Sequence, residues 1–153
     1  SINFAGPLCE CGNRGCLETI ASVPAILSAL ESRMLPSHPG IDAVVESALA
    51  GDVACVRVLA DAGTALGMAA AILCTVLNPD HIVVGGAITR AGDILLRTLG
   101  DAMRRYAVPA SGNRARITTS VHGDRATAIG ALMLARQVFV EAEHSNNEVP
   151  VHE

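Results

Sequence analysis

Three cysteines lie close together near the start of the chain, in the run Cys9-Glu-Cys11-Gly-Asn-Arg-Gly-Cys16. Thiolates are soft ligands, and zinc takes four donors in a tetrahedron. Gly12 and Gly15 permit the tight backbone that would return Cys16 to the other two thiols. The spacing therefore predicts a zinc site that uses Cys9, Cys11 and Cys16. Two other interpretations stay open, namely a disulfide between two of the three and a set of small core residues.

No fourth ligand stands out in the sequence. Glu10 is too close along the chain to converge easily on the same ion, and the histidines have no spacing that nominates one of them: His38, His81, His122, His144 and His152. Cys55 and Cys74 fall at apolar positions of a predicted helix and are expected in the core. An odd total of 5 cysteines argues against a disulfide framework and favours a reducing, cytoplasmic location.

Composition restricts the possible functions. The 153 residues allow one domain, with 50% apolar and 17% charged residues. A net charge of −4, a pI near 5.7 and few aromatic residues disfavour binding of this segment to nucleic acid or anionic lipid. The longest apolar stretch noted, Met68–Leu77, is too short to span a membrane and predicts a buried helix. No secretory signal is visible, and the start at Ser1 without Met suggests a fragment or a processed product.

The first half of the chain has helical patterns. Apolar spacing predicts a helix from Leu17 to about Leu35, interrupted at Pro24, with Ser22 as a cap of its second piece. After a linker at 36–40, we expect Asp42 to cap a short helix through Ala50. Asp52 should cap a long helix that Asn78-Pro79 ends; Gly63, Gly67 and Ala70 leave one face of it small enough for another backbone to approach.

The second half alternates between strand and helix. Ile82-Val83-Val84 predicts a strand buried on both faces, and Gly85-Gly86 turns the chain into a helix over about 89–106. Alternation at Ile117, Thr119 and Val121 predicts a second strand, and Asp124 a cap of a last helix through about Val140. This order predicts an α/β layer with parallel strands. Two strands are too few for a self-sufficient sheet, so further strands are expected elsewhere.

Three segments together resemble a known family. Cys9-x-Cys11-Gly12-x-x-Gly15-Cys16-x-Glu18 resembles the zinc signature of the ROK family, which contains bacterial sugar kinases and sugar-responsive repressors. Leu77-Asn-Pro-Asp-His-Ile-Val-Val-Gly-Gly86 is similar to a second segment of that family, and Asp124-Arg-Ala-Thr-Ala-Ile-Gly-Ala131 to its C-terminal helix. The segments follow the family order at family-like spacing, from residue 6 to about 136.

The resemblance implies a fold. The chain would form part of the C-terminal lobe of an actin-like architecture, the ribonuclease H-like fold of sugar kinases and heat-shock ATPases. Residues 1–143 would make this lobe, with a zinc loop at 1–16 and an α/β part at 17–143. The polar segment 144–153 is expected to be a disordered tail.

The resemblance also implies what the chain lacks. The family's fourth zinc ligand is a His of a Gly-His pair that would lie just before Ser1. The aspartate-glycine phosphate loop, the catalytic Asp and the first strands of the lobe are likewise missing. We therefore expect partial zinc occupancy and no kinase activity from the chain on its own.

Two positions carry implied ligand contacts. The family counterpart of Glu18 accepts hydrogen bonds from sugar hydroxyls, a task that suits a carboxylate. The alternative for Glu18 is a helix first-turn residue favoured by the macrodipole. Gly85 and Gly86 resemble the segment that lies against the nucleotide in the kinases, although a Gly pair at such a turn is also common.

The implied function divides into three hypotheses. The leading one is the sugar-binding effector lobe of a transcriptional regulator, because Leu17 replaces a Trp found in many glucokinases of this type. The second is the C-terminal lobe of an ATP-dependent sugar kinase. The third is a non-catalytic fragment that self-associates or pairs with another chain, because a strand edge and a small-residue helix face are available. The expected partners are a sugar or amino sugar, a second copy of the chain, and DNA only through an N-terminal domain, with no membrane.

Overall fold

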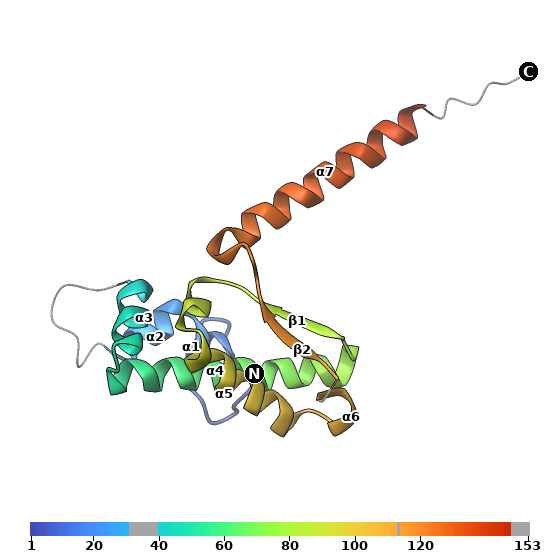
Figure 1. Cartoon of the computed structure of the whole chain (residues 1–153). Coiled ribbons are helices and arrows are strands. Elements are labelled where there is room, and N and C mark those ends of the chain that lie inside the picture. The colour runs from blue at the N-terminus through green and yellow to red at the C-terminus, as the bar shows by residue number, and fades with distance from the viewer. Residues whose placement is uncertain (31–39, 113, 148–153) are drawn as a thin grey trace, which may run out of the picture.

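Helix α4 (Val53–Leu77) runs through the body of the molecule and organises it (Figure 1). The computed structural model describes residues 1–30, 40–112 and 114–147. As predicted, Asp52 caps α4, because its Oδ1 accepts a hydrogen bond from the Cys55 amide at 2.8 Å. The helix ends at Asn78, which takes a left-handed conformation with φ of 46° directly before Pro79.

Helix α5 (Asp93–Tyr106) packs against the small-residue face of α4. A Cβ atom at Gly63 would lie 2.6 Å from the Leu95 carbonyl oxygen, and one at Gly67 would lie 2.6 Å from the Ala102 Cβ. The two backbones therefore approach more closely than any side chain allows. The prediction that another backbone approaches this face is confirmed, and that backbone belongs to α5 of the same chain. The face is therefore not available for binding a second chain.

A first apolar cluster joins α4 and α5 to the short helices α1 (Glu18–Ala21), α2 (Val23–Ser28) and α3 (Ile41–Leu49). Its largest fully buried members come from separate elements: Ile26, Leu30, Val44, Leu59 and Leu95. The predicted cap at Ser22 is confirmed, because its Oγ accepts from the Ala25 amide at 3.2 Å. The predicted cap at Asp42 is wrong, since Gly40 is the N-cap of α3 and Asp42 lies in its first turn. The predicted helix end near Leu35 and most of the linker lie outside the described residues.

Two strands form the parallel layer that the sequence predicts. Strand β1 (His81–Val84) pairs with β2 (Arg116–Thr119), and Ile82 lies opposite Ile117. These two side chains pack on a second apolar cluster, which contains Ala70, Ala71, Cys74 and Met103. The opposite face is open, with Val83 64% exposed. Burial of β1 on both faces was therefore a wrong prediction for this chain, because no described element covers the outer face.

Two connections differ from the predicted elements. The helix expected from Thr89 is divided: a 3-10 helix, η1 (Ala87–Ala91), precedes α5, because Gly92 has a φ of 55° that ends the first piece. Helix α6 (Pro109–Gly112) was not predicted at all. Strand β2 ends at Thr119, so Val121 lies beyond it and is exposed.

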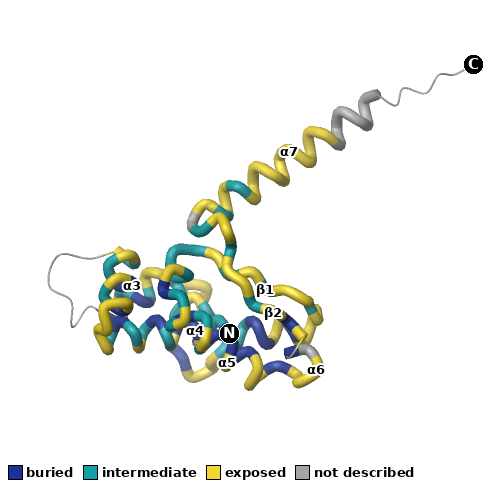
Figure 2. Tube along the Cα trace, viewed as in Figure 1, coloured by how far each residue is buried: buried dark blue, intermediate teal, exposed yellow. Residues whose placement is uncertain are grey.

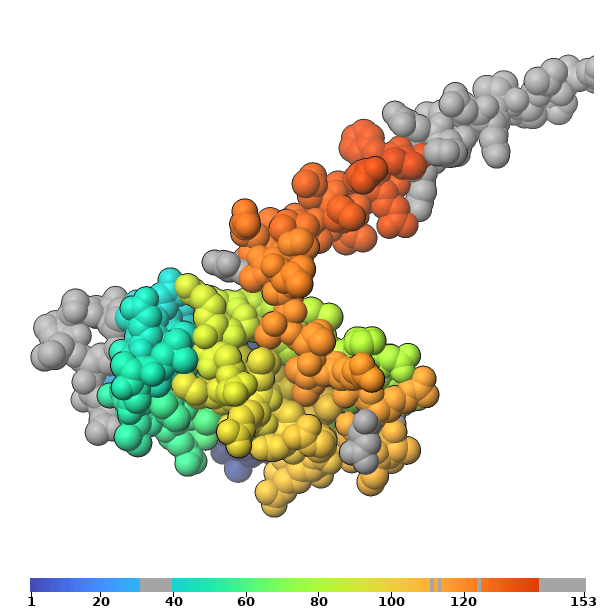
Figure 3. Space-filling view, in the orientation of Figure 1, coloured from blue at the N-terminus to red at the C-terminus, as the bar shows by residue number. Residues whose placement is uncertain are grey.

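The last helix, α7 (Ala126–Asn147), follows the 3-10 turn η2 (Gly123–Arg125) and projects away from the body (Figures 1 and 3). It continues past the predicted end at Val140 and into the segment predicted to be a tail. Large apolar side chains are exposed along it, including Leu132, Met133, Leu134, Val138 and Phe139 (Figure 2). An apolar helix of this kind is normally covered in a folded protein.

By length and composition, α4 could also cross a membrane. Among the described residues it is the one helix that is both long enough and apolar enough to span a bilayer: an 18-residue stretch of it has a mean hydropathy of 1.6. In the structure, 44% of that stretch is buried inside the protein. The apolar stretch Met68–Leu77 is only the second part of this helix. A core helix of a globular protein passes the same test, and α4 packs against α1, α3 and α5.

Candidate metal and ligand site

The cysteine loop is closed by its own backbone. Leu8 and Arg14 form an antiparallel bridge, and inside it the Cys9 amide donates to the Asn13 carbonyl at 2.7 Å. The Gly12 amide returns to the Cys9 carbonyl at 2.9 Å. Gly12 has a φ of 85°, a conformation that side-chain-bearing residues rarely adopt. The predicted role of this glycine in tightening the loop is therefore confirmed.

Gly15 makes a second close approach, to the first residues of the chain. Its carbonyl accepts from the Ile2 amide at 2.8 Å and from the Asn3 amide at 3.2 Å. Its φ is 58°, and a Cβ atom at this position would overlap the Asn3 carbonyl oxygen. The loop therefore depends on glycine here both for the backbone angle and for space.

The three thiols converge as the spacing predicts. The Sγ atoms of Cys9, Cys11 and Cys16 all lie within 4.8 Å of one another, and those of Cys11 and Cys16 are 3.6 Å apart. A tetrahedral zinc with Zn–S bonds of about 2.3 Å separates its sulfur ligands by about 3.8 Å. The donor type and the spacing of these atoms therefore fit a metal ion, and this cluster could hold one. In the described part of the chain the cluster consists of these three thiols.

The structure also bears on the two alternatives. All three cysteines are free thiols. Cys9 is buried, with 7% of its surface exposed, whereas Cys11 is exposed and Cys16 is half-buried. The core interpretation is wrong for Cys11, because an exposed side chain in a loop contributes nothing to a core. By contrast, Cys55 and Cys74 are buried in α4, as predicted.

The thiols perturb one another. A hydrogen bond from the Asn13 backbone amide, with further ones from the Cys9 and Cys16 thiols, lowers the pKa of Cys11 to about 7. Donation of its proton to Cys11, together with desolvation, raises the pKa of Cys16 to about 11. One thiol of the pair is thus stabilised as a thiolate by the other, as expected of neighbouring sulfur ligands.

Glu18 follows the last thiol of the cluster as the first residue of α1. The Thr19 amide and hydroxyl both donate to the Cys16 carbonyl, at 3.0 and 2.8 Å. These bonds tie the first turn of α1 to the cysteine loop, so that Glu18 moves with Cys16. The Glu18 side chain is exposed to solvent. It can accept hydrogen bonds from a ligand without breaking any contact in the core.

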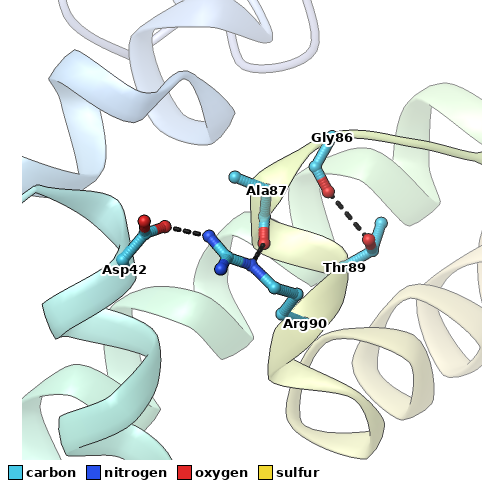
Figure 4. A network of polar contacts seen from close by, with 5 residues as sticks. All are labelled: Asp42, Gly86, Ala87, Thr89 and Arg90. Atoms are coloured by element: carbon cyan, nitrogen blue, oxygen red, sulfur yellow. Dashed lines mark hydrogen bonds and ion pairs between the residues drawn. The ribbon is translucent and has the colours of Figure 1, made fainter. Parts of the chain in front are cut away.

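The Gly85-Gly86 turn follows the carboxyl end of β1, and Figure 4 shows Gly86 with Thr89 and Arg90 of the next turn. Gly86 has a φ of 101°, and its carbonyl accepts from the Thr89 hydroxyl at 2.7 Å. Arg90 donates to the Ala87 carbonyl at 3.4 Å and forms an ion pair with Asp42 of α3. Sequence reasoning missed this pair, because 48 positions separate the two residues and neither belongs to a motif.

A hollow of about 430 Å³ lies between the first residues, α1 and α4. Its lining is mostly apolar and includes Ile2, Ile20, Asp61 and Met68. Glu18 does not line it, and neither do Gly85 and Gly86. Glu18 and Gly85 are exposed, and Gly86 is half-buried.

The geometry defines a class of protein: an α/β lobe in which a loop of three thiols is tied by hydrogen bonds to the first turn of helix α1. The ROK family matches residues 1–138, and the chain belongs to that family. It is 33% identical over 142 residues to the DNA-binding transcriptional repressor Mlc of Escherichia coli K12, an alignment that covers 88% of this chain and 35% of the repressor. It is 32% identical over 158 residues to a glucokinase of Halalkalibacterium halodurans, covering 95% and 48%.

Among solved structures, a ROK glucokinase from Streptomyces griseus in complex with glucose and AMPPNP superimposes with a TM-score of 0.73 at 25% identity. The match covers 86% of this chain and 48% of that one. The chain therefore has part of the actin-like fold, as predicted. It spans between about a third and a half of the length of the curated relatives it matches. Both regulators and kinases occur among its relatives.

Proposed function

We propose that the chain is the sugar-binding effector lobe of a ROK-family transcriptional regulator, with a zinc-held loop beside the sugar site. The observation that carries the proposal is the position of Glu18, at the start of α1 and tied through Thr19 to Cys16. To recognise a sugar, the side chain that binds it must be held in a fixed position. The thiol loop supplies that support.

Glu18 would bind two hydroxyls of a sugar or amino sugar. An ionised carboxylate has two oxygen acceptors, so it can receive two hydrogen bonds from neighbouring ring hydroxyls. Each such bond to a charged group is worth about 1.5–3 kcal/mol. Cys9, Cys11 and Cys16 would hold zinc, which here supplies only a fixed charge and a rigid loop. With a fourth ligand expected upstream, the chain alone should bind zinc at less than one equivalent. This measurement requires only elemental analysis of the purified chain.

The contribution of Glu18 is tested by Glu18→Gln in the complete protein, with sugar affinity measured by isothermal titration calorimetry over a panel of hexoses and amino sugars. Glu46→Gln, on the exposed face of α3, is the matched control. Loss of two charge-assisted hydrogen bonds should weaken binding at least about tenfold. Equal affinities for the two variants would remove Glu18 from the site.

The second candidate is the C-terminal lobe of an ATP-dependent sugar kinase. Glucokinases are among the relatives, and the structural neighbour with glucose and AMPPNP shares the fold. In a kinase, the bare backbone of Gly85 and Gly86 would lie against the nucleotide. Leu17 favours the regulator, since many glucokinases of this type have Trp there.

The sequence encoded upstream of Ser1 distinguishes the two candidates. A DNA-binding helix-turn-helix without a catalytic Asp would support the regulator. An intact aspartate-glycine phosphate loop together with the catalytic Asp would establish the kinase instead. In either case we place the protein in the cytoplasm, since an odd number of cysteines, three of them clustered as candidate metal ligands, favours a reducing compartment.

Association with a second copy is a further part of the proposal, and α7 favours it. Leu134 is 66% exposed and Phe139 is 74% exposed, on a helix that projects from the body. Burial of two such side chains contributes about 3–6 kcal/mol. Sedimentation velocity should show an oligomer that Leu134→Glu with Phe139→Glu dissociates, while Thr127→Glu on the same helix does not. A monomeric parent chain would contradict self-association.

A further inference from the structure

We propose that Cys11 and Cys16 form a reversible oxidation site, in which a peroxide converts the two thiols to a disulfide and thereby removes the metal-binding capacity of the loop. The inference concerns the same loop as the proposed function, and only its consequence for sugar binding rests on that function. It begins from the geometry of the three thiols, which singles out one pair.

The pair is defined by contact and by access. The Cys11 and Cys16 sulfurs are 3.6 Å apart, so they need to approach by only about 1.5 Å to reach a disulfide bond length of about 2.05 Å. Cys11 is exposed, whereas Cys9 is buried. An oxidant in solvent therefore meets Cys11 first, with Cys16 as the neighbouring thiol that resolves the product.

The backbone already holds the chain in the closed form that a disulfide needs. The Leu8–Arg14 bridge and the Cys9–Asn13 hydrogen bond close the loop without any covalent link. Gly12, at a φ of 85°, lies between the two cysteines and lets the backbone adjust. Closure of the disulfide thus costs little additional chain entropy.

The chemistry balances with a peroxide as the oxidant. The Cys11 thiolate attacks one oxygen of hydrogen peroxide and the O–O bond breaks, which leaves Cys11 as a sulfenic acid; the departing hydroxide takes a proton from solvent and becomes water. The Cys16 sulfur then attacks the Cys11 sulfur, the S–O bond breaks, and the hydroxyl leaves as a second water. The two sulfurs have lost two electrons to the peroxide. Reduction by a dithiol reverses the reaction through thiol–disulfide exchange.

The expected consequences follow from the ligand set. A disulfide removes two of the three thiolates, and Cys9 and the fourth ligand expected in the complete protein are too few to hold zinc. Because the Cys16 carbonyl accepts two bonds from Thr19, displacement of Cys16 should also disturb the first turn of α1. In the oxidised protein, Glu18 would then lose the support on which its position depends.

The sequence makes the disulfide easy to locate. Trypsin cleaves after Arg14, which separates a peptide containing Cys9 and Cys11 from one containing Cys16. After treatment of the complete protein with hydrogen peroxide and blocking of free thiols, non-reducing mass spectrometry should show these two peptides joined, with loss of two hydrogens. A Cys9–Cys11 disulfide would instead stay within the first peptide and would contradict the proposal.

Variants identify the pair. The joined peptides should persist in Cys9→Ser and in the control Cys74→Ser, and should be lost in Cys11→Ser. Joined peptides in Cys11→Ser with none in Cys9→Ser would overturn the assignment of Cys11. The absence of joined peptides in the parent protein would overturn the whole inference.

Two further readouts separate this inference from the proposed function. Zinc released to a chromophoric chelator should rise with the joined peptides and fall again when a dithiol is added with zinc; zinc retained in fully oxidised protein would contradict the proposal. Amide hydrogen exchange over residues 16–21 should increase on oxidation, and unchanged exchange would refute the link to α1. Neither measurement uses a sugar, so failure of sugar binding would leave these results intact.

Discussion

Because α4 and α5 are in close contact, we predict that Gly67→Ala lowers the stability of the protein. A Cβ at Gly67 would lie 2.6 Å from the Ala102 Cβ and nearer still to the Leu99 carbonyl oxygen, whereas ordinary contact begins at 3.4 Å. The helices would have to separate by most of an ångström, because neither a helix carbonyl nor an alanine can rotate away. Overpacking of this kind costs about 1–3 kcal/mol or more, and the gain in helix propensity is only about 1 kcal/mol. We expect a net loss of about 2 kcal/mol.

Gly100→Ala is the matched control, because it makes the same change in α5. There the nearest atoms are the end of the flexible Arg104 side chain at 3.3 Å and the Ile117 Cδ1 at 3.7 Å. The higher helix propensity of alanine should therefore outweigh the small steric cost and raise the free energy of unfolding by up to about 1 kcal/mol. For a protein of this size, thermal unfolding followed by circular dichroism should place Gly67→Ala about 4–8 °C below the parent and Gly100→Ala up to about 4 °C above it. Equal shifts for both would refute the packing argument.

Three other changes test further contacts of the fold, among them the exposed ion pair between Arg114 and Asp80, whose Nε and Oδ1 atoms lie 2.6 Å apart. Asp52→Ala removes the cap of α4 and should lower the free energy of unfolding by about 1 kcal/mol, measured by urea titration. The Arg114 guanidinium lowers the pKa of Asp80 below its ordinary value of 3.8, so the pair stabilises the protein above that range and the contribution is lost as pH falls. Arg114→Gln should therefore lower the melting temperature at neutral pH but not in strong acid; a loss that is independent of pH would contradict this. Gly15→Ala should abolish zinc binding while α4 stays folded, as shown by elemental analysis and circular dichroism, since Asn3 leaves no room for a side chain.

Local sequence signals predicted much of the fold. Asp52, the helical spacing after it and Asn78-Pro79 gave both ends of α4, because capping and the steric effect of proline act within a few residues. The division of the helix at Gly92 was missed, because a single glycine is also tolerated inside helices. The open face of β1 was missed for another reason: an apolar strand shows that its faces are suited to burial, not which elements are present to cover them.

The candidate site was predictable to a similar degree. The spacing of Cys9, Cys11 and Cys16 was enough to predict their convergence, because glycines at fixed offsets restrict the loop. The ion pair between Asp42 and Arg90 was not predictable, since it depends on how α3 and η1 pack across the first apolar cluster. Contacts between segments that are distant along the chain produce no recognisable pattern in a single sequence.

The hydrogen bonds from Ile2 and Asn3 to Gly15 have a consequence for communication through the lobe. They fasten the first residues to Gly15, which lies next to Cys16, and Thr19 fastens Cys16 to the turn that bears Glu18. If a ligand at Glu18 favours one position of the turn and these bonds hold, it also favours one position of the first residues, and by linkage the reverse holds equally. A signal would then pass between the proposed sugar site and residues 1–3 through a few hydrogen bonds, without any rearrangement of α4 or the core.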